Sequence, residues 1–207
     1  MLIERLVVSP QHAYEGRPSY GPVPVETSSP PSIELRAGYG VVGDRYAGRA
    51  AHRDAALTII AAEALEAVAA ELGVPPFDPA LARRTVVTRG LDVEALRGTD
   101  VLLDSGDGPV LLGGRRPAAP CAWMDVVLAR GAHAALRGRA GVRFAVLGSG
   151  TLRVGPLSVT FPPGELHGTR SLLDDADDAA LLAVRLDPAR AAVGTHRRRA
   201  SVPPGPR

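Results

Sequence analysis

Short apolar, β-branched segments separated by glycine and proline recur along this sequence, and they constrain the fold more than any other feature. Such segments are typical of β-strands closed by turns. The sequence predicts strands at 2–8, 32–36, 56–60, 85–88, 101–104, 109–113, 142–147, 151–154 and 157–161, and helices at 61–72 and 122–130. Because the strands do not alternate regularly with helices, the pattern favours a mainly antiparallel β-barrel with inserted helices over a doubly wound parallel sheet.

The 207 residues fit one domain with a tail. Residues 9–31 contain six prolines, which predicts a long irregular connection, and such loops often lie over a functional site. The apolar segment 179–186 is compatible with either a helix or a strand. Beyond it the sequence loses its apolar periodicity and contains three consecutive arginines, so we expect a single domain over 1–186 and a disordered basic tail over 187–207.

Composition excludes several kinds of chemistry. The chain has no lysine, so a pyridoxal phosphate Schiff base and a Walker lysine are impossible. Its one cysteine excludes an internal disulfide and a multi-cysteine metal site. The 24 basic residues are nearly balanced by 22 acids, and aromatic residues are few, which argues against specific nucleic-acid binding. The chain lacks an apolar run of about 18 residues and a long apolar leader, so we expect a cytoplasmic protein that does not enter a membrane.

Cys121 is the first candidate for reactivity. It follows Pro120 at the start of the predicted helix, close in sequence to Arg115 and Arg116. A helix N-terminus and nearby guanidinium groups both favour a thiolate, which could attack an electrophile, carry sulfur or bind a soft metal. The alternative is that Cys121 is simply a small buried apolar residue, which is common for free cysteine.

Two arginine-containing segments are candidates for anion binding. One is the glycine-rich loop 38–48 with Gly43, Asp44 and Arg45, whose backbone N–H groups and guanidinium could surround an anion. The other is Arg83-Arg84-Thr85, where paired guanidinium groups beside a hydroxyl suit a phosphate. Each could instead be a turn with solvated arginines, as could the basic turn 137–141. We expect Arg45, Arg83 and Arg84 to converge on one anion site.

Taken in order, these segments resemble the MOSC family, the domain found at the C-terminus of molybdenum cofactor sulfurases. The resemblance covers roughly residues 1–165. It rests on motifs in the family's order, namely Gly-x-x-Gly-Asp-Arg (40–45), a β segment and helix with Thr58, Ile60 and Glu63, Arg-Arg-x-Val-Val (83–87) with Gly90-Leu91, Leu96-x-Gly98, Pro120-Cys121 and Arg-Gly-Arg-x-Gly (137–141). The chain departs from the family at Tyr46, where histidine is usual, at Thr85, where asparagine is usual, and at Pro156, where aspartate is usual.

The resemblance implies a MOSC-like antiparallel β-barrel that binds a molybdopterin-type cofactor. It assigns Cys121 as the residue that ligates molybdenum or carries sulfur. It assigns cofactor contacts to Gly43, Asp44, Arg45, Arg83, Arg84, Thr85 and Pro120. Two functions remain open at this point. One is an enzyme that reduces N-oxygenated substrates or transfers sulfur; the other is a non-catalytic module that delivers cofactor or sulfur to a partner enzyme. Sulfur or electrons would come from another protein.

Overall fold

Two β-sheets form the framework of the protein. A computed structural model describes residues 1–163, which belong to one compact unit. In the larger sheet the strand order is β10-β1-β5-β4-β8-β7-β6-β11, and in the smaller it is β3-β2-β9. The larger sheet contains β1 (Leu2–Leu6), β4 (Leu57–Ala61), β5 (Val86–Arg89), β6 (Asp100–Asp104), β7 (Val110–Pro117), β8 (Val142–Val146), β10 (Gly155–Pro156) and β11 (Ser158–Thr160). The smaller contains β2 (Ser32–Arg36), β3 (Gly40–Val41) and β9 (Gly150–Arg153).

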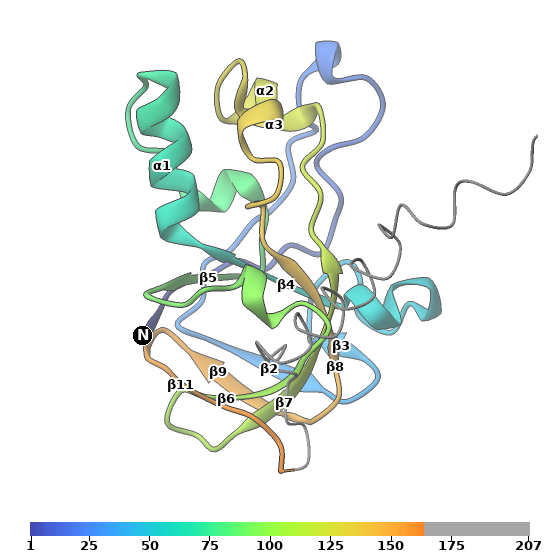
Figure 1. The fold of residues 1–207 in the computed structure, drawn as a ribbon. Helices are drawn as coiled ribbons and strands as arrows, with labels where there is room; N and C mark the ends of the chain where they lie inside the picture. Colours follow the sequence, from blue (N-terminus) through green and yellow to red (C-terminus); the bar gives the residue numbers. More distant parts are fainter. Residues whose placement is uncertain (164–207) are drawn as a thin grey trace, which may run out of the picture. The chain divides into compact units, whose positions relative to one another are not determined.

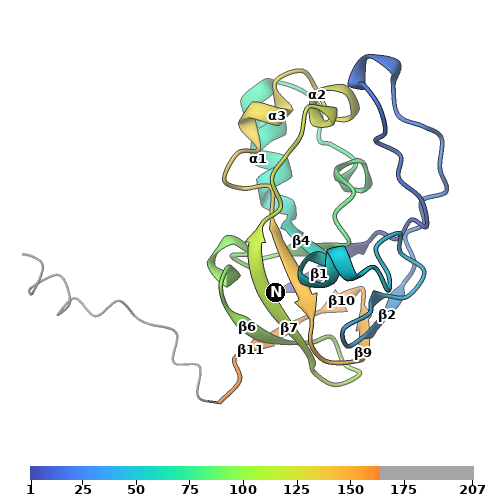
Figure 2. The ribbon, with the colours of Figure 1, turned by 90° about the vertical axis from the view of Figure 1, so that its right-hand side faces the viewer.

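The larger sheet curls into a nearly closed barrel (Figures 1 and 2). Its two outermost strands, β10 and β11, are neighbours in the sequence with only Leu157 between them. The N–H group of Leu157 donates to the carbonyl oxygen of Met1 at 3.1 Å, next to the pairing of β10 with β1. The mainly antiparallel barrel predicted from the sequence is therefore confirmed.

One pair of strands in the barrel is parallel. β4 and β5 pair from Ile59 opposite Val86 to Ala61 opposite Thr88, whereas every other pair of named strands is antiparallel. A parallel pair needs a long crossover connection, usually through a helix. Here the connection contains α1 (Ala62–Leu72), and it brings the chain back to the start of β5.

The helices lie together beyond one end of the barrel. Both ribbon views show α1, α2 (Trp123–Val127) and α3 (Ala132–Ala135) at that end, beside the loop 9–31 (Figures 1 and 2). The short 3-10 helices are η1 (Pro18–Tyr20), η2 (Ala50–Ala55), η3 (Pro79–Ala82) and η4 (Glu94–Leu96). The helix expected at 122–130 is therefore wrong in extent, because the chain leaves helical geometry after Val127 and begins α3 after Gly131.

Apolar side chains form two separate cores. One fills the barrel, where fully buried residues such as Leu35, Leu112 and Phe144 meet from both sheets. The other lies between the sheet and the helices and includes Leu65 of α1 and Trp123 of α2. The second core fixes the helices, and the loops attached to them, against the end of the barrel.

Gly141 closes the turn before β8 and tolerates no side chain. Its φ is +91°, and a Cβ atom built on it would lie 2.0 Å from the carbonyl oxygen of Ile59. Its N–H group donates to the Glu94 carboxylate at 2.8 Å. The turn 137–141 thus approaches the backbone of β4 more closely than any residue except glycine permits.

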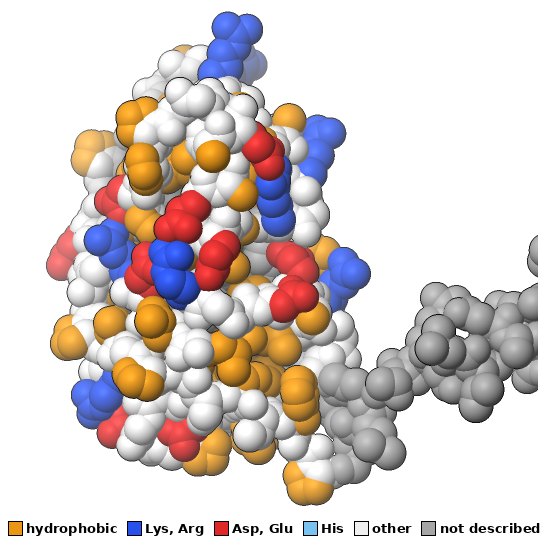
Figure 3. Space-filling view, turned by 60° about the vertical axis from the view of Figure 1, so that its left-hand side comes forward, with side chains coloured by type: hydrophobic (Ala, Val, Ile, Leu, Met, Phe, Trp, Pro, Cys, Tyr) orange, Lys and Arg blue, Asp and Glu red, His pale blue; other side chains and the backbone are white. Residues whose placement is uncertain are grey.

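Several charged side chains on the surface form ion pairs. Arg89 binds Glu4 and Glu66, and Arg139 binds Glu71. On the face drawn in Figure 3, basic and acidic side chains lie next to one another rather than in a patch of one sign. No helix of the described chain is long and apolar enough to cross a bilayer. The segment 179–186 and the boundary predicted at residue 187 lie outside the described residues.

Candidate functional site

Cys121 lies in a pocket with four arginines. This cysteine pocket has a volume of about 260 Å³ and is lined by His12, Tyr14, Arg45, Tyr46, Ala82, Arg83, Arg84, Ala119, Cys121, Trp123, Met124 and Arg143. The lining residues come from the loop 9–31, the turn after β3, the junction of η3 with β5, the segment around the start of α2, and β8. Arg45, Arg83 and Arg84 therefore line one pocket together with Arg143, and the binding of an anion there stays a prediction.

Arg83 directly follows η3 in an unusual backbone conformation. Asp78 caps η3 by accepting the N–H group of Ala80 at 3.0 Å. The helix ends at Arg83, whose φ of 52° is left-handed and is the only positive φ of a residue other than glycine in the described chain. This conformation costs about 1–2 kcal/mol for a residue with a side chain. Its persistence indicates that the surrounding contacts hold Arg83 in place.

Arg83 is buried and bound by uncharged oxygens. Its Nη1 donates to the Thr27 hydroxyl at 3.1 Å, and its Nη2 donates to the carbonyl oxygen of Gln11 at 2.8 Å. The guanidinium carbon lies 5.4 Å from the centre of the Tyr14 ring. Burial of the guanidinium, and secondly the positive charge of Arg45, lower the pKa of Arg83. The environment of Arg83 is therefore one that an added negative charge would stabilise.

Arg84 holds two backbone segments together. Its Nε donates to the carbonyl oxygen of Ala140 and its Nη2 to that of Ala118, each at 2.9 Å. Arg84 is partly exposed, but its guanidinium is buried. This burial, and secondly the positive charge of Arg143, lower the pKa of Arg84 to about 10. Arg84 remains charged at neutral pH. Two of its three nitrogens donate to backbone carbonyl oxygens. The main role of Arg84 is therefore to hold the backbone that forms the pocket wall.

Arg45 carries an unsatisfied donor. Its Nη1 lies 3.2 Å from the carboxylate of Asp44, which also accepts the N–H group of Tyr46 at 3.0 Å. The guanidinium lies 4.6 Å from the centre of the Tyr46 ring. Its Nε is buried and has no hydrogen-bond partner among residues 1–163. A buried donor left unpaired costs about 1–3 kcal/mol, which a bound acceptor would recover.

The cysteine pocket has an excess of positive charge. Four of its lining residues are arginines and none is acidic, counting only the part of the chain described. Burial of the imidazole, and secondly the positive charge of Arg45, lower the pKa of His12. His52 lies outside the lining, with its ring centre 4.3 Å from that of Tyr46. Burial, and secondly the positive charge of Arg49, lower the pKa of His52. The arrangement suits an anion better than a cation.

Cys121 itself is exposed, so the interpretation of a buried structural cysteine is wrong. The cations near it are not those expected from the sequence. Arg115 pairs with Asp100 at 3.1 Å, and Arg115 and Arg116 line a different hollow. With only five residues, α2 is also too short to supply the dipole that we expected to favour a thiolate.

The other predicted site residues support the pocket from outside its lining. Gly43 has a φ of +83° and makes the turn that leads into Asp44. Thr85 is buried, and its N–H group donates to the Thr58 hydroxyl at 3.0 Å. Pro120 precedes Cys121 directly and is partly exposed. In the described structure, Gly43 and Thr85 thus stabilise the backbone at this end of the barrel.

Several pocket residues had no individual signal in the sequence. His12 and Tyr14 belong to the proline-rich loop 9–31. We expected this loop to lie over a functional site, but the sequence singled out none of its residues. Trp123 stacks on Tyr14 with ring centres 5.3 Å apart and planes 15° apart. Arg143 lies within β8, where an arginine is typical of a solvated strand face. The basic turn proposed at 137–141 instead sends Arg139 to Glu71 on the surface.

Comparisons with known proteins point to one family. The sequence profile of the MOSC domain matches residues 41–156, more than half of the chain. Among solved structures, YuaD from Bacillus subtilis is similar with a TM-score of 0.54 and 19% identity, covering 78% of this chain and 100% of that chain. YiiM from Geobacillus stearothermophilus is similar with a TM-score of 0.55 and 16% identity, covering 77% of this chain and 74% of that chain. A search of curated proteins finds no match.

Proposed function

The chain belongs to the MOSC domain family, and from this premise we propose that it binds a molybdopterin-type cofactor in the cysteine pocket and reduces an N-oxygenated substrate. The observation that carries the proposal is the meeting of an exposed thiol with four arginines, one of which has an unpaired buried donor. A pterin phosphate supplies the acceptors that such a cluster lacks.

The residues present fit a cofactor that brings most of its own metal ligands. No group of three or more His, Cys, Asp or Glu side chains that could hold a metal ion occurs within residues 1–163. A metal held by protein ligands alone is therefore not supported there. Cys121 would contribute one sulfur to molybdenum, a soft ligand for a metal whose other ligands belong to the cofactor.

The arginines would divide the remaining work. Arg45 would donate to the cofactor's phosphate through Nε, which has no protein partner. Arg143 and Arg83 would add positive charge from two other sides of the pocket. Arg84 would keep the wall in place through the carbonyl oxygens of Ala118 and Ala140. Gly43, Thr85 and Pro120 would shape the backbone around these contacts, and Asp44 would hold Arg45 through its carboxylate.

When bound, the cofactor supplies a two-electron redox centre beside Cys121. Reduction of an N–OH group to N–H consumes two electrons and two protons and releases water. The electrons would come from a separate donor protein. The alternative is a carrier role, in which Cys121 holds sulfur received from an external donor, or the whole chain delivers cofactor to a partner enzyme. Occupancy without turnover would favour delivery.

Cofactor analysis of variants tests the proposal. The protein would be expressed in a host that makes molybdenum cofactor, and the purified chain analysed for molybdenum and pterin. We expect both in the wild type, loss of molybdenum in Cys121→Ser, and less pterin in Arg45→Gln. Arg97→Gln is the matched control, because Arg97 is exposed and lies outside the pocket lining.

Two results would contradict the proposal. One is a wild-type protein without pterin in a host whose other molybdenum proteins are loaded. The other is equal molybdenum content in Cys121→Ser and the wild type. With occupancy established, turnover of an N-hydroxylated compound with a chemical electron donor separates the reductase from the delivery role.

A further inference from the structure

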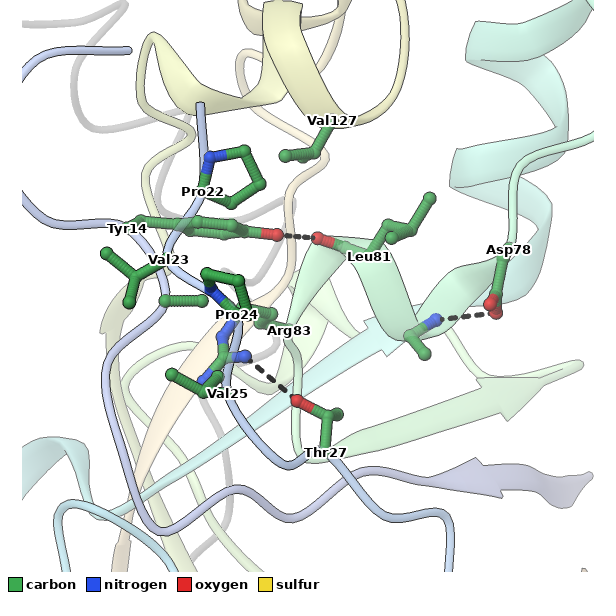
Figure 4. Close-up of a pocket in the computed structure, with 12 residues that line it drawn as sticks. Tyr14, Pro22, Val23, Pro24, Val25, Thr27, Asp78, Leu81, Arg83 and Val127 are labelled. Carbon is green, nitrogen blue, oxygen red and sulfur yellow. Dashed lines mark hydrogen bonds between the residues drawn. The ribbon is translucent and has the colours of Figure 1, made fainter. Parts of the chain in front are cut away.

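A second pocket adjoins the cysteine pocket and shares two residues with it. This proline pocket has a volume of about 450 Å³ and is lined by Ala13, Tyr14, Pro22, Val23, Pro24, Val25, Thr27, Asp78, Ala80, Leu81, Arg83 and Val127. Tyr14 and Arg83 belong to both linings. Figure 4 shows the proline pocket between the loop that contains residues 22–25 and the turn of η3.

The walls of the proline pocket are mostly apolar. Pro22, Val23 and Pro24 lie on the loop side, while Leu81 comes from η3 and Val127 from α2 (Figure 4). Val23 and Leu81 remain 46% and 42% exposed. A ligand that covers such apolar surface removes it from water, which favours binding in proportion to the area covered. The pocket therefore offers binding energy to an apolar group.

Arg83 places a positive charge against these walls. A guanidinium group has five N–H donors, and the hydrogen bonds to Thr27 and Gln11 use two of them. Both partners are uncharged oxygens. The acidic residue of the lining, Asp78, is engaged elsewhere, because its carboxylate caps η3 and pairs with Arg5. The charge of Arg83 is thus not matched by a carboxylate among the described residues that line the pocket.

We propose that the proline pocket binds a small apolar carboxylic acid, with its carboxylate on Arg83 and its apolar body among Val23, Val25, Leu81 and Val127. A planar carboxylate matches the guanidinium fork. A phosphate would lose more hydration on entry, and the apolar walls offer it little in return. The proposal goes beyond cofactor binding and does not rest on it.

Tyr14 and Trp123 provide a direct readout of occupancy. Tyr14 forms part of the pocket lining, and its ring stacks on Trp123, the one tryptophan of the chain. The Tyr14 hydroxyl donates to the carbonyl oxygen of Leu81 at 2.5 Å, which fixes the ring between the two pockets. A ligand that enters the proline pocket should therefore change tryptophan fluorescence.

The test is a fluorescence titration of the purified chain, with calorimetry as a second measure of binding. The probes are benzoate, which has both features, benzyl alcohol, which lacks the charge, and acetate, which lacks the apolar body. We expect benzoate to bind at least about tenfold more tightly than either. Benzyl alcohol lacks the hydrogen bond to a charged group, which contributes about one to two factors of ten. Acetate lacks the apolar body, whose burial favours binding in proportion to the area covered. Equal affinity for benzoate and benzyl alcohol, or no saturable binding of benzoate, would overturn the proposal.

Two variants of Val25 locate the binding site. Val25 and Arg83 both line the proline pocket, and the view in Figure 4 draws Val25 next to the Arg83 guanidinium. Val25→Glu provides an internal carboxylate that pairs with Arg83 and replaces that of the ligand, whereas Val25→Gln has nearly the same size without the charge. We expect Val25→Glu to weaken benzoate binding at least about tenfold and Val25→Gln to weaken it by less than about threefold. Unchanged binding to Val25→Glu would place the ligand outside this pocket and refute the assignment.

Discussion

Replacing Gly141 by alanine should destabilise the protein far more than the same change three residues earlier. Gly138 and Gly141 lie in one turn and have similar φ values, +79° and +91°. A Cβ atom at Gly138 would meet nothing within 4 Å, whereas one at Gly141 would lie 2.0 Å from the carbonyl oxygen of Ile59. The pair therefore separates the cost of backbone conformation from the cost of a steric clash.

The two costs can be estimated from the structure. A side chain in left-handed geometry costs about 1–2 kcal/mol, and this is the whole expected loss for Gly138→Ala. In Gly141→Ala, forced displacement of packed backbone adds about 1–3 kcal/mol. Weakening of the hydrogen bond from the Gly141 N–H group to Glu94 adds about 1 kcal/mol more. We expect a total loss of about 3–6 kcal/mol for Gly141→Ala.

Urea unfolding followed by circular dichroism measures both losses. The turn also carries the carbonyl oxygen of Ala140 that accepts from Arg84, so Gly141→Ala should disturb the cysteine pocket while Gly138→Ala leaves it intact. Similar losses of unfolding free energy in the two variants would refute the reasoning, because they would mean that the backbone of β4 yields to the added methyl group at little cost.

Three further changes test single contacts. Because the pKa of His12 is lowered in the fold, stability should fall as the pH drops below about 6.5, and His12→Gln should reduce that loss in unfolding measured at pH 7 and pH 5. Glu63→Gln should cost about 0.5–1.5 kcal/mol in urea unfolding, since the carboxylate accepts the Gly90 N–H group at 2.7 Å. Thr85→Val should cost about 1–3 kcal/mol in the same assay, because it leaves the Thr58 hydroxyl and N–H group with one fewer partner.

The strands could be predicted from the sequence because their apolar pattern is local. The segments 32–36 and 85–88 coincide with β2 and β5 to within a residue at each end. The helix predicted at 122–130 is wrong in extent, because the chain leaves helical geometry after Val127 and turns before α3. The Asp125 carboxylate accepts the N–H group of His133 at 2.7 Å, and this contact accompanies the turn between α2 and α3. Nothing in the local sequence specifies that hydrogen bond.

The same distinction applies to the site. Cys121 and Arg45 could be proposed from the sequence because a cysteine directly after a proline at a predicted helix start, and an arginine in a glycine-rich loop, are local features. The role of Arg84 could not be predicted, because its partners are the backbone carbonyl oxygens of Ala118 and Ala140. Arg143 could not be distinguished from an ordinary strand arginine until the fold turned it toward the pocket.

The cysteine pocket is assembled from segments that are far apart in the chain, from His12 to Arg143, and this links occupancy to cellular lifetime. The unfolded chain has no such site, so a ligand bound there withdraws molecules from the unfolded population by mass action. At a ligand concentration 100 times the dissociation constant, the gain is about 2.7 kcal/mol, or roughly a hundredfold fewer unfolded molecules exposed to proteases. The supply of the ligand would then set how much of the protein a cell retains.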